Sequence, residues 1–190
     1  MTVIISMLRG VNLAGHNKIS MNALRALYES LGLRDAQTYI QSGNVIFRTR
    51  AQDMELLRNR IANAIESSFG FRVDVILRSS SDLKAVIAKN PFAKRSDIEP
   101  SKLLVTFLAS DPGREVRERV LAIEAHPEEL RIEGRELYIY FPNGMARPKL
   151  SPALLDKTLK TSWTGRNWNT VRKLLEIAEG LEARGSLKRP

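Results

Sequence analysis

The order in which hydrophobic patterns follow one another along the first 80 residues constrains the fold of this chain most strongly. An apolar run comes first and a stripe with helical spacing follows; two short extended runs then precede a second stripe and a last alternating run. The predicted elements are a strand at Val3–Leu8, a helix between Ser20 and Gly32, strands at Ala36–Gln41 and Val45–Arg48, a helix between Met54 and Gly70, and a strand over Phe71–Leu77. This β-α-β-β-α-β order is typical of a ferredoxin-like domain, which we predict for residues 1–80.

Part of this order recurs about 100 residues later. The predicted elements there are a short helix from Ser81, a linker over Lys89–Ser101, a strand at Leu103–Leu108, a helix opening at Asp111-Pro112, a hairpin of Leu130–Ile132 with Leu137–Phe141, and helices near Pro152–Leu159 and Asn167–Leu181. We therefore predict an α+β protein with a ferredoxin-like subdomain at 1–80, a helix and linker at 81–101, and a second α+β subdomain (β-α-β-β plus C-terminal helices) at 102–190. A duplication would explain the recurrence, although a shared topology is weak evidence for one.

The composition is that of a soluble globular chain, because 43% of the 190 residues are hydrophobic and 27% are charged. The absence of cysteine excludes disulfide bonds, thiolate zinc sites and cysteine nucleophiles. No apolar run approaches the roughly 20 residues of a membrane-spanning helix. The apolar N-terminus lacks a basic leader and continues into a charged loop, so it reads as a strand and not as a signal peptide. We expect a cytoplasmic protein with no membrane partner.

The net charge of +9 is unevenly distributed. Residues 145–190 hold ten Lys/Arg against four Asp/Glu, a difference of +6, and both tryptophans, Trp163 and Trp168, lie there too. A basic end that carries aromatic residues is able to attract phosphates or nucleic acid. The alternative is a solvated helix face with two core aromatic residues.

Three separated motifs resemble a known bacterial family. They are Leu8-Arg9-Gly10-Val11-Asn12-Leu13-Ala14-Gly15-His16-Asn17-Lys18-Ile19, then Thr38-Tyr39-Ile40-Gln41-Ser42-Gly43-Asn44-Val45, and near the end Arg166-Asn167-Trp168-Asn169-Thr170-Val171. In this order they resemble the family called domain of unknown function 1697, and the resemblance runs nearly end to end. It implies two α+β subdomains in tandem, the first ferredoxin-like, and it implies no activity. Val11 and Leu13-Ala14 depart from the Ile and Val-Gly of the family pattern.

The loop after the first strand is the first candidate site, since loops at the edge of a sheet often carry function. Gly10 and Gly15 allow backbone N–H groups to turn inward, and the helix capped by Ser20 offers its positive end to an anion. The spacing matches no Walker loop and no dinucleotide fingerprint. The alternative is a tight turn in which the asparagines act as caps. The candidate ligand-binding residues of this loop are Arg9, Asn12, His16, Asn17 and Lys18.

A purely structural role would also explain two features of this region, His16 and the turn at Gln41–Asn44. His16 has the residue type for proton transfer, but no carboxylate lies near it in sequence before Glu29, which favours a surface or hydrogen-bonding role. The segment Gln41-Ser42-Gly43-Asn44 joins two strands, and a hairpin turn alone explains Gly43 and Asn44. Gln41, Ser42 and Asn44 are nevertheless candidate ligand contacts, because the end of this strand can face the first loop.

The third candidate segment, Arg166-Asn167-Trp168-Asn169-Thr170, opens the last long helix. Trp168 begins the stripe Trp168, Val171, Leu174/Leu175 and Ala178, which favours a core position over a stacking platform. Arg166 at a helix start would oppose the helix dipole, so we expect it to pair with a carboxylate or to hold an anionic ligand. Asn167 and Asn169 are the other candidate contacts of this segment.

The sequence therefore predicts a binding function and assigns no reaction. Two distant histidines and no clustered carboxylates argue against a metal site, and hydrolase triads and kinase loops are absent. The main hypothesis is a protein that binds a small anionic or phosphate-bearing ligand in a polar cleft formed by the three segments. The alternatives are a nucleic-acid-binding protein that uses the basic C-terminal region, and a structural or interaction protein. No cofactor and no oligomeric state are predicted.

Overall fold

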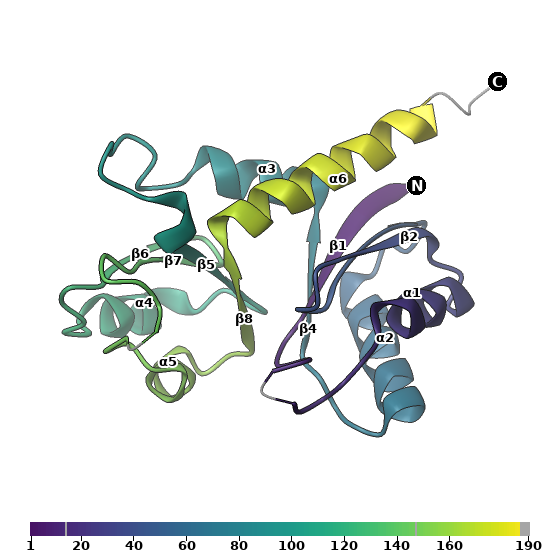
Figure 1. The fold of residues 1–190 in the computed structure, drawn as a ribbon, viewed down its shortest axis with the longest axis horizontal. Helices are drawn as coiled ribbons and strands as arrows, with labels where there is room; N and C mark the ends of the chain where they lie inside the picture. The colour runs from purple at the N-terminus through teal and green to yellow at the C-terminus, as the bar shows by residue number, and fades with distance from the viewer. Residues whose placement is uncertain (14, 147, 187–190) are drawn as a thin grey trace. The chain divides into compact units, whose positions relative to one another are not determined.

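The computed structural model of the protein describes residues 1–13, 15–146 and 148–186. The chain forms two compact units, one of Met1–Lys84 with the helical segment that starts at Lys173, the other of Ala85–Arg172. Each unit contains one four-stranded antiparallel sheet (Figure 1). The predicted α+β class is thus confirmed. The predicted domain limits, which kept the whole last helix with the second subdomain, stay a prediction.

The first unit has the predicted element order. In chain order it contains β1 (Thr2–Leu8), α1 (Met21–Ser30), β2 (Arg34–Tyr39), β3 (Asn44–Thr49), α2 (Met54–Phe69) and β4 (Val75–Ser79). The sheet order is β2-β3-β1-β4, so the first strand along the chain is central and pairs with both β3 and β4. Consequently, the β-α-β-β-α-β pattern predicted from the periodicities is confirmed.

Two helices cover one face of this sheet. Ile4 and Leu8 of β1 pack in one core with Tyr28 of α1 and Ile61 of α2. The N-terminus of α1 is capped as predicted, because the side chain of Ser20 accepts a hydrogen bond from the first turn. A single apolar layer thereby fixes the sheet and both helices of the unit.

Two strand boundaries differ from the prediction. β2 begins and ends two residues earlier than Ala36–Gln41, because Ile40 has a φ of 51° and leaves the extended conformation. β4 begins at Val75 and not at Phe71. Val73 precedes β4 and packs in the core without strand pairing, so its apolar character shows burial rather than a strand.

The second unit repeats the arrangement of the first. It contains β5 (Leu103–Leu108), α4 (Gly113–Leu121), β6 (Glu129–Glu133), β7 (Glu136–Tyr140), α5 (Pro152–Leu159) and β8 (Trp163–Asn167). Its sheet order, β6-β7-β5-β8, corresponds strand for strand to that of the first unit. The predicted strand at Leu103–Leu108 and the predicted helix at Pro152–Leu159 are confirmed. The second unit is therefore a complete β-α-β-β-α-β repeat.

β8 corrects the prediction for the end of the chain. The sequence predicts that the last helix opens at Arg166, but Trp163–Asn167 forms a strand that pairs antiparallel with β5, with Arg166 opposite Val105. Its sequence, Trp-Thr-Gly-Arg-Asn, shows no apolar alternation because Thr164 and Arg166 occupy buried positions. Because polar residues occupy its buried positions, this strand could not be predicted from the hydrophobic pattern.

A helix follows the fourth strand of each repeat directly. These helices are α3 (Ser80–Ala88) and α6 (Trp168–Ser186), and a short 3-10 helix, η1 (Pro100–Lys102), lies in the predicted linker. The predicted core stripe of α6 is confirmed, since Trp168, Val171, Leu174 and Ala178 are buried. The tryptophans Trp163 and Trp168 are each 8% exposed, so neither offers a free ring face.

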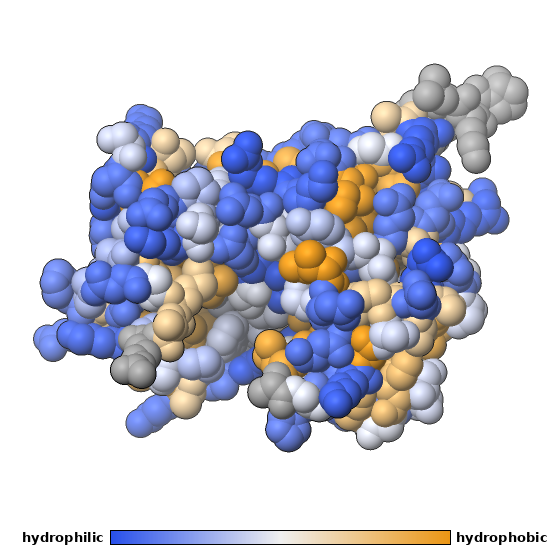
Figure 2. Space-filling model, viewed as in Figure 1, coloured by the Kyte–Doolittle hydropathy of each residue, from blue (hydrophilic) through white to orange (hydrophobic). Residues whose placement is uncertain are grey.

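The exterior agrees with the composition. The face drawn in Figure 2 is mainly hydrophilic, with hydrophobic residues in small groups between hydrophilic ones. Among the described residues, no helix combines the length and the apolar character needed to cross a membrane.

Candidate functional site

The first loop and the Gln41–Asn44 turn meet in the first unit. The Nδ2 group of Asn12 donates to the carbonyl of Gln41 at 2.9 Å and to that of Ile19 at 3.0 Å. The backbone N–H of Ile19 donates back to Asn12 Oδ1 at 2.9 Å. One asparagine side chain therefore joins both ends of the loop to the turn.

Gly43 brings the turn against the loop. Its φ is 73°, and an added Cβ would lie 2.5 Å from Cγ2 of Val11 and 2.9 Å from Cβ of Leu8. The backbone N–H of Leu8 donates to the carbonyl of Gly43 at 2.9 Å. Glycine is required here both for the left-handed conformation and for the close approach. The turn therefore contacts the first loop, as the position of Gln41 at the end of its strand allows.

The other predicted asparagines of this region also hold the backbone. Asn17 Nδ2 donates to the carbonyl of Gly10 at 3.0 Å. Asn44 is fully buried, and its Nδ2 group donates to the carbonyl of Tyr39 at 3.0 Å and to Ser42 Oγ at 2.9 Å. These contacts give the asparagines a structural role in the two turns. Whether any of them also binds a ligand stays a prediction.

Other polar side chains of the loop and of the turn are more accessible. His16, Lys18 and Gln41 are exposed, and Arg9 lies 3.8 Å from Asp74, close enough for a weak ion pair. Among the described residues, no carboxylate contacts His16. A proton-transfer role for this histidine therefore gains no support. Ala14, where the sequence departs from the family pattern, lies outside the described residues.

Arg166 and its neighbours lie in the second unit. Arg166 is 6% exposed on β8, and its guanidinium donates to Thr164 Oγ1 at 2.7 Å and to the carbonyl of Gly165 at 2.8 Å. Burial lowers the pKa of Arg166 to about 10, so the group is still charged at neutral pH. The predicted position at a helix start is wrong, because α6 begins two residues later. The helix-dipole argument for a ligand at Arg166 therefore no longer applies.

The two remaining predicted residues cap the join between β8 and α6. Asn167 Nδ2 donates to the carbonyl of Ser101 at 2.7 Å, and its Oδ1 accepts from the backbone N–H of Asn169 at 3.0 Å. The predicted meeting of this segment with the first loop in one cleft stays a prediction, since the two belong to different units.

A pocket in the first unit has the chemistry of an anion site, and we call it the arginine pocket. It has a volume of about 360 Å³. It is lined by Arg34, Arg48, Arg50 and Arg60, together with Met1, Leu31, Gly32, Leu33, Thr49, Ala51 and Leu57. Four guanidinium groups thus surround one small space, and none of the lining residues is acidic.

Two of these arginines are held by the fold. Arg60 Nη2 donates to the carbonyl of Leu31 at 2.9 Å, at the C-terminal end of α1. Arg48 lies 3.2 Å from the carboxylate of Asp35 and donates to the carbonyl of Leu181 on α6. These bonds fix the guanidinium groups in place.

The other two arginines of the pocket lie at the surface. Arg34 and Arg50 are exposed and form no ion pair with any residue that the structure describes. Arg34 stands directly opposite Arg48 in the pairing of β2 with β3. Like charges opposite one another destabilise a sheet, so this arrangement does not serve the stability of the fold. The sequence did not reveal it, because the pairing of Arg34 with Arg48 depends on the irregular register of β2.

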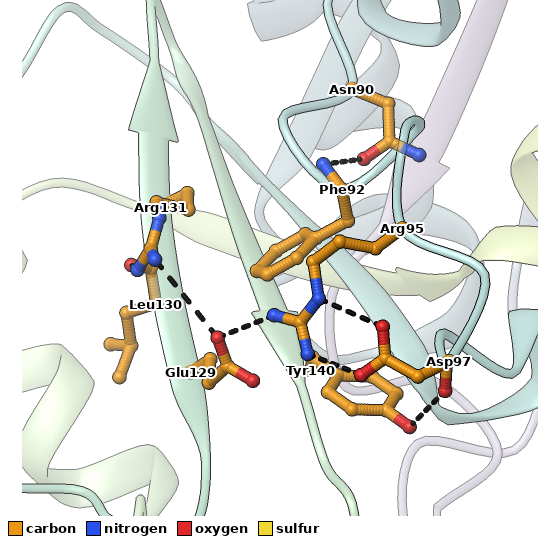
Figure 3. Close-up of polar contacts among 8 residues, drawn as sticks. All are labelled: Asn90, Phe92, Arg95, Asp97, Glu129, Leu130, Arg131 and Tyr140. Carbon is orange, nitrogen blue, oxygen red and sulfur yellow. Dashed lines mark hydrogen bonds and ion pairs between the residues drawn. The ribbon is translucent and has the colours of Figure 1, made fainter.

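The second unit also has an arginine cluster, but its charges are balanced (Figure 3). Arg95 contacts Asp97 at 2.5 Å and Glu129 at 2.7 Å, and Arg131 lies 4.0 Å from Glu129. The hydrogen bonds to Asp97 and Glu129 raise the pKa of Arg95, and the bond from Arg95 lowers the pKa of Asp97. Two cations and two carboxylates therefore satisfy one another.

Aromatic rings complete this cluster. Arg95 lies 5.7 Å from the ring centre of Phe92 and 5.9 Å from that of Tyr140, whose hydroxyl donates to the carbonyl of Asp97 at 3.1 Å. The cluster pins the segment before η1 to β6 and β7. It is a structural clamp, whereas the arginine pocket keeps an excess of positive charge.

The described residues contain no group of three or more histidine, cysteine or acidic side chains suited to a metal ion. The arginine pocket offers guanidinium groups to a ligand. Such groups bind anions.

Comparisons with known proteins agree with the fold. A search of curated proteins found no match. The conserved bacterial protein SP0830 from Streptococcus pneumoniae has a similar structure, with a TM-score of 0.68 and 24% sequence identity over 94% of this chain and 99% of that one. At this identity the likeness shows the fold alone. The family described as "Protein of unknown function (DUF1697)" matches residues 1–138, and the chain belongs to this family.

Proposed function

We propose that this protein binds a small anionic ligand and that the arginine pocket of the first unit holds the negative charge. The observation that carries the proposal is the set of four arginines around a single pocket with no acidic lining residue. Asp35 offsets one of these charges through Arg48. An anion is the remaining counter-charge that would make this arrangement favourable.

The pocket is also partly preorganised for an anion. Arg48 and Arg60 donate to backbone carbonyl groups, so less conformational entropy is lost when they bind a ligand. Hydrogen bonds between a guanidinium and a phosphate or carboxylate are charge-assisted and among the strongest in proteins. The four arginines therefore provide both attraction and geometry.

Ligand contact at the first loop remains part of the prediction. His16, Lys18 and Gln41 are its exposed polar side chains, but their neighbouring asparagines are engaged with the backbone. A cytoplasmic location is likewise retained as a proposal. The nucleic-acid alternative gains no specific support, because the tryptophans of the basic C-terminal region are buried and cannot stack on bases.

The proposal can be tested by calorimetric titration and thermal unfolding with inorganic phosphate and pyrophosphate. A bound anion raises the melting temperature in a concentration-dependent manner. The double variant Arg34→Gln/Arg50→Gln removes two charges that have no partner among the described residues, so the fold should remain intact. We expect it to bind pyrophosphate about tenfold to a hundredfold more weakly.

A matched control separates the pocket from the general charge of the surface. Arg25→Gln/Arg72→Gln removes the same charge from two exposed positions of the first unit that do not line the pocket. This variant should bind pyrophosphate as the unaltered protein does. Equal weakening in both double variants, or no binding by the unaltered protein, would refute the proposal.

A further inference from the structure

We infer that Asp35 competes with the ligand of the arginine pocket for Arg48, and that the ligand which displaces it carries a phosphoryl group. The inference rests on the anion-binding function proposed above. The carboxylate of Asp35 lies 3.2 Å from Nη1 of Arg48, although Asp35 itself does not line the pocket. An oxygen of this chain therefore occupies the place at Arg48 that an oxygen of an anionic ligand would take.

An irregularity in β2 brings Asp35 to this place. Arg34 pairs with Arg48 across the two strands. The next regular pair is Gln37 with Ile46, so two residues of β2 stand opposite one residue of β3, as in a β-bulge. Asp35 is the first of the two, and its φ of 54° lies in the left-handed region, which aspartate tolerates better than most residues. Bulges often re-aim a side chain beside a functional site.

The surroundings of the ion pair decide which partner can leave it. The side chain of Arg48 is 13% exposed and that of Asp35 is 50% exposed. Nη2 of Arg48 donates to the carbonyl of Leu181, so the guanidinium keeps a second anchor when the ion pair opens. The carboxylate is thus the partner that a ligand displaces, and its displacement uncovers Nη1 of Arg48.

The competition selects the chemical class of the ligand. A free carboxylate offers Arg48 the same kind of group as Asp35, but Asp35 is tethered and acts at an effective concentration on the order of millimolar or more. A free carboxylate consequently gains nothing by the exchange. A phosphoryl group carries about −1.5 to −2 charges and more acceptor oxygens. It can accept from Arg34 and Arg48 together, since these residues stand opposite one another.

Calorimetric titration of the full chain with pyrophosphate and with citrate, which carry similar negative charge at neutral pH, tests the inference. Asp35→Asn removes the competing charge and keeps a residue that tolerates a positive φ. This variant should bind both anions about twofold to tenfold more tightly. The matched control is Asp74→Asn, because Asp74 is 44% exposed, lies 3.8 Å from Arg9 and does not line the pocket. The control should leave both affinities unchanged.

A charge-neutral double variant tests the class of the ligand. Asp35→Asn/Arg48→Gln removes both partners of the ion pair. It should bind pyrophosphate about twofold to tenfold more weakly than the unaltered protein and citrate equally well, because only the phosphoryl group reaches Arg48 in the unaltered protein. Equal weakening for both anions would overturn the phosphoryl assignment.

The outcomes also separate this inference from the function on which it rests. If Asp35→Asn changes the melting temperature and leaves both affinities unchanged, Asp35 serves the fold alone and the inference fails, while anion binding stands. Weaker binding by Asp35→Asn would show that Asp35 orients Arg48 for the ligand, which also contradicts competition. If neither anion binds to the unaltered protein, the inference and the proposed function both fail.

Discussion

Buried hydroxyl groups on the first strand of each repeat show how single residues differ between the two units. Ser6 on β1 and Thr106 on β5 are both fully buried. Ser6 Oγ lies 2.7 Å from the hydroxyl of Tyr28, and burial raises the pKa of that tyrosine. Thr106 Oγ1 has no hydrogen-bond partner among the described residues. One unit satisfies its buried hydroxyl and the other leaves it unsatisfied.

Replacement of Thr106 by valine should therefore stabilise the protein. An unsatisfied buried hydroxyl costs about 1 to 3 kcal/mol, and valine has nearly the same shape, so we expect a gain of about 1 kcal/mol. Urea unfolding of the variant measures it. As a contrast, Ser6→Ala should lower stability by about 1 kcal/mol, since the Tyr28 hydroxyl would lose its partner. A less stable Thr106→Val protein would show that this hydroxyl is bonded.

At the scale of elements, the contact between the first loop and the Gln41–Asn44 turn depends on Gly43. Gly43→Ala would place a methyl group 2.5 Å from Val11 and force a residue with a side chain into a φ of 73°. We expect a loss of at least about 2 kcal/mol in unfolding free energy from strain and overpacking together.

Gly10 provides the comparison for Gly43. Its φ is 69°, but an added Cβ would have no atom within 4 Å. Gly10→Ala should thus cost only the conformational strain of about 1 kcal/mol. Chemical unfolding of both variants measures the difference. Equal losses would mean that the turn does not pack tightly against the loop.

The clamp around Arg95 is an element-scale feature with a pH dependence. The bond from Arg95 lowers the pKa of Asp97 in the folded state. A carboxyl group whose pKa is lowered by folding adds stability above its ordinary pKa, near 4, and this contribution disappears as the pH falls through the lowered pKa. Asp97→Asn should remove this dependence and speed amide hydrogen exchange in the segment before η1, as mass spectrometry would show. Unchanged exchange at neutral pH would contradict the clamp.

The sequence predicted those elements whose residues follow a regular pattern. The Ser20 cap and the run Leu103–Leu108 could be recognised because apolar spacing and local capping coincide with the true elements. β8 could not, since its buried Arg166 is compensated by hydrogen bonds that no linear pattern reveals. The arginine pocket could not be predicted for a related reason. Arg34 and Arg48 are 14 positions apart in the chain and meet only through strand pairing.

At the scale of the whole molecule, two repeats of one topology have different surface chemistry. The second unit neutralises Arg95 and Arg131 with Asp97 and Glu129. The first unit leaves positive charge around its pocket. Part of the net charge of +9 therefore surrounds a candidate site that lies outside the basic C-terminal region, which holds most of the excess positive charge.

The first unit is not continuous in the chain, because α6 contributes to it from Lys173 onward. Leu174, Ala178 and Leu181 of this segment are buried, and Lys84 lies 3.3 Å from Glu179. Burial of the two leucines contributes about 1.5 to 3 kcal/mol each. A typical domain is stable by only about 5 to 15 kcal/mol, so the two leucines together contribute a large fraction of such a value.

A chain that ends at Arg172 should consequently lose the fold of its first unit, although the sheet itself is intact in sequence. We expect NMR spectra in which signals from residues 1–84 collapse into the unfolded range, and addition of a peptide of residues 168–186 should restore them. The same peptide with Leu174→Ser and Leu181→Ser should not, because it lacks two side chains that are buried in the native protein. A truncated protein with native signals from the first sheet would show that this unit is stable without α6, and the bond from Arg48 to Leu181 would then be dispensable for the shape of the arginine pocket.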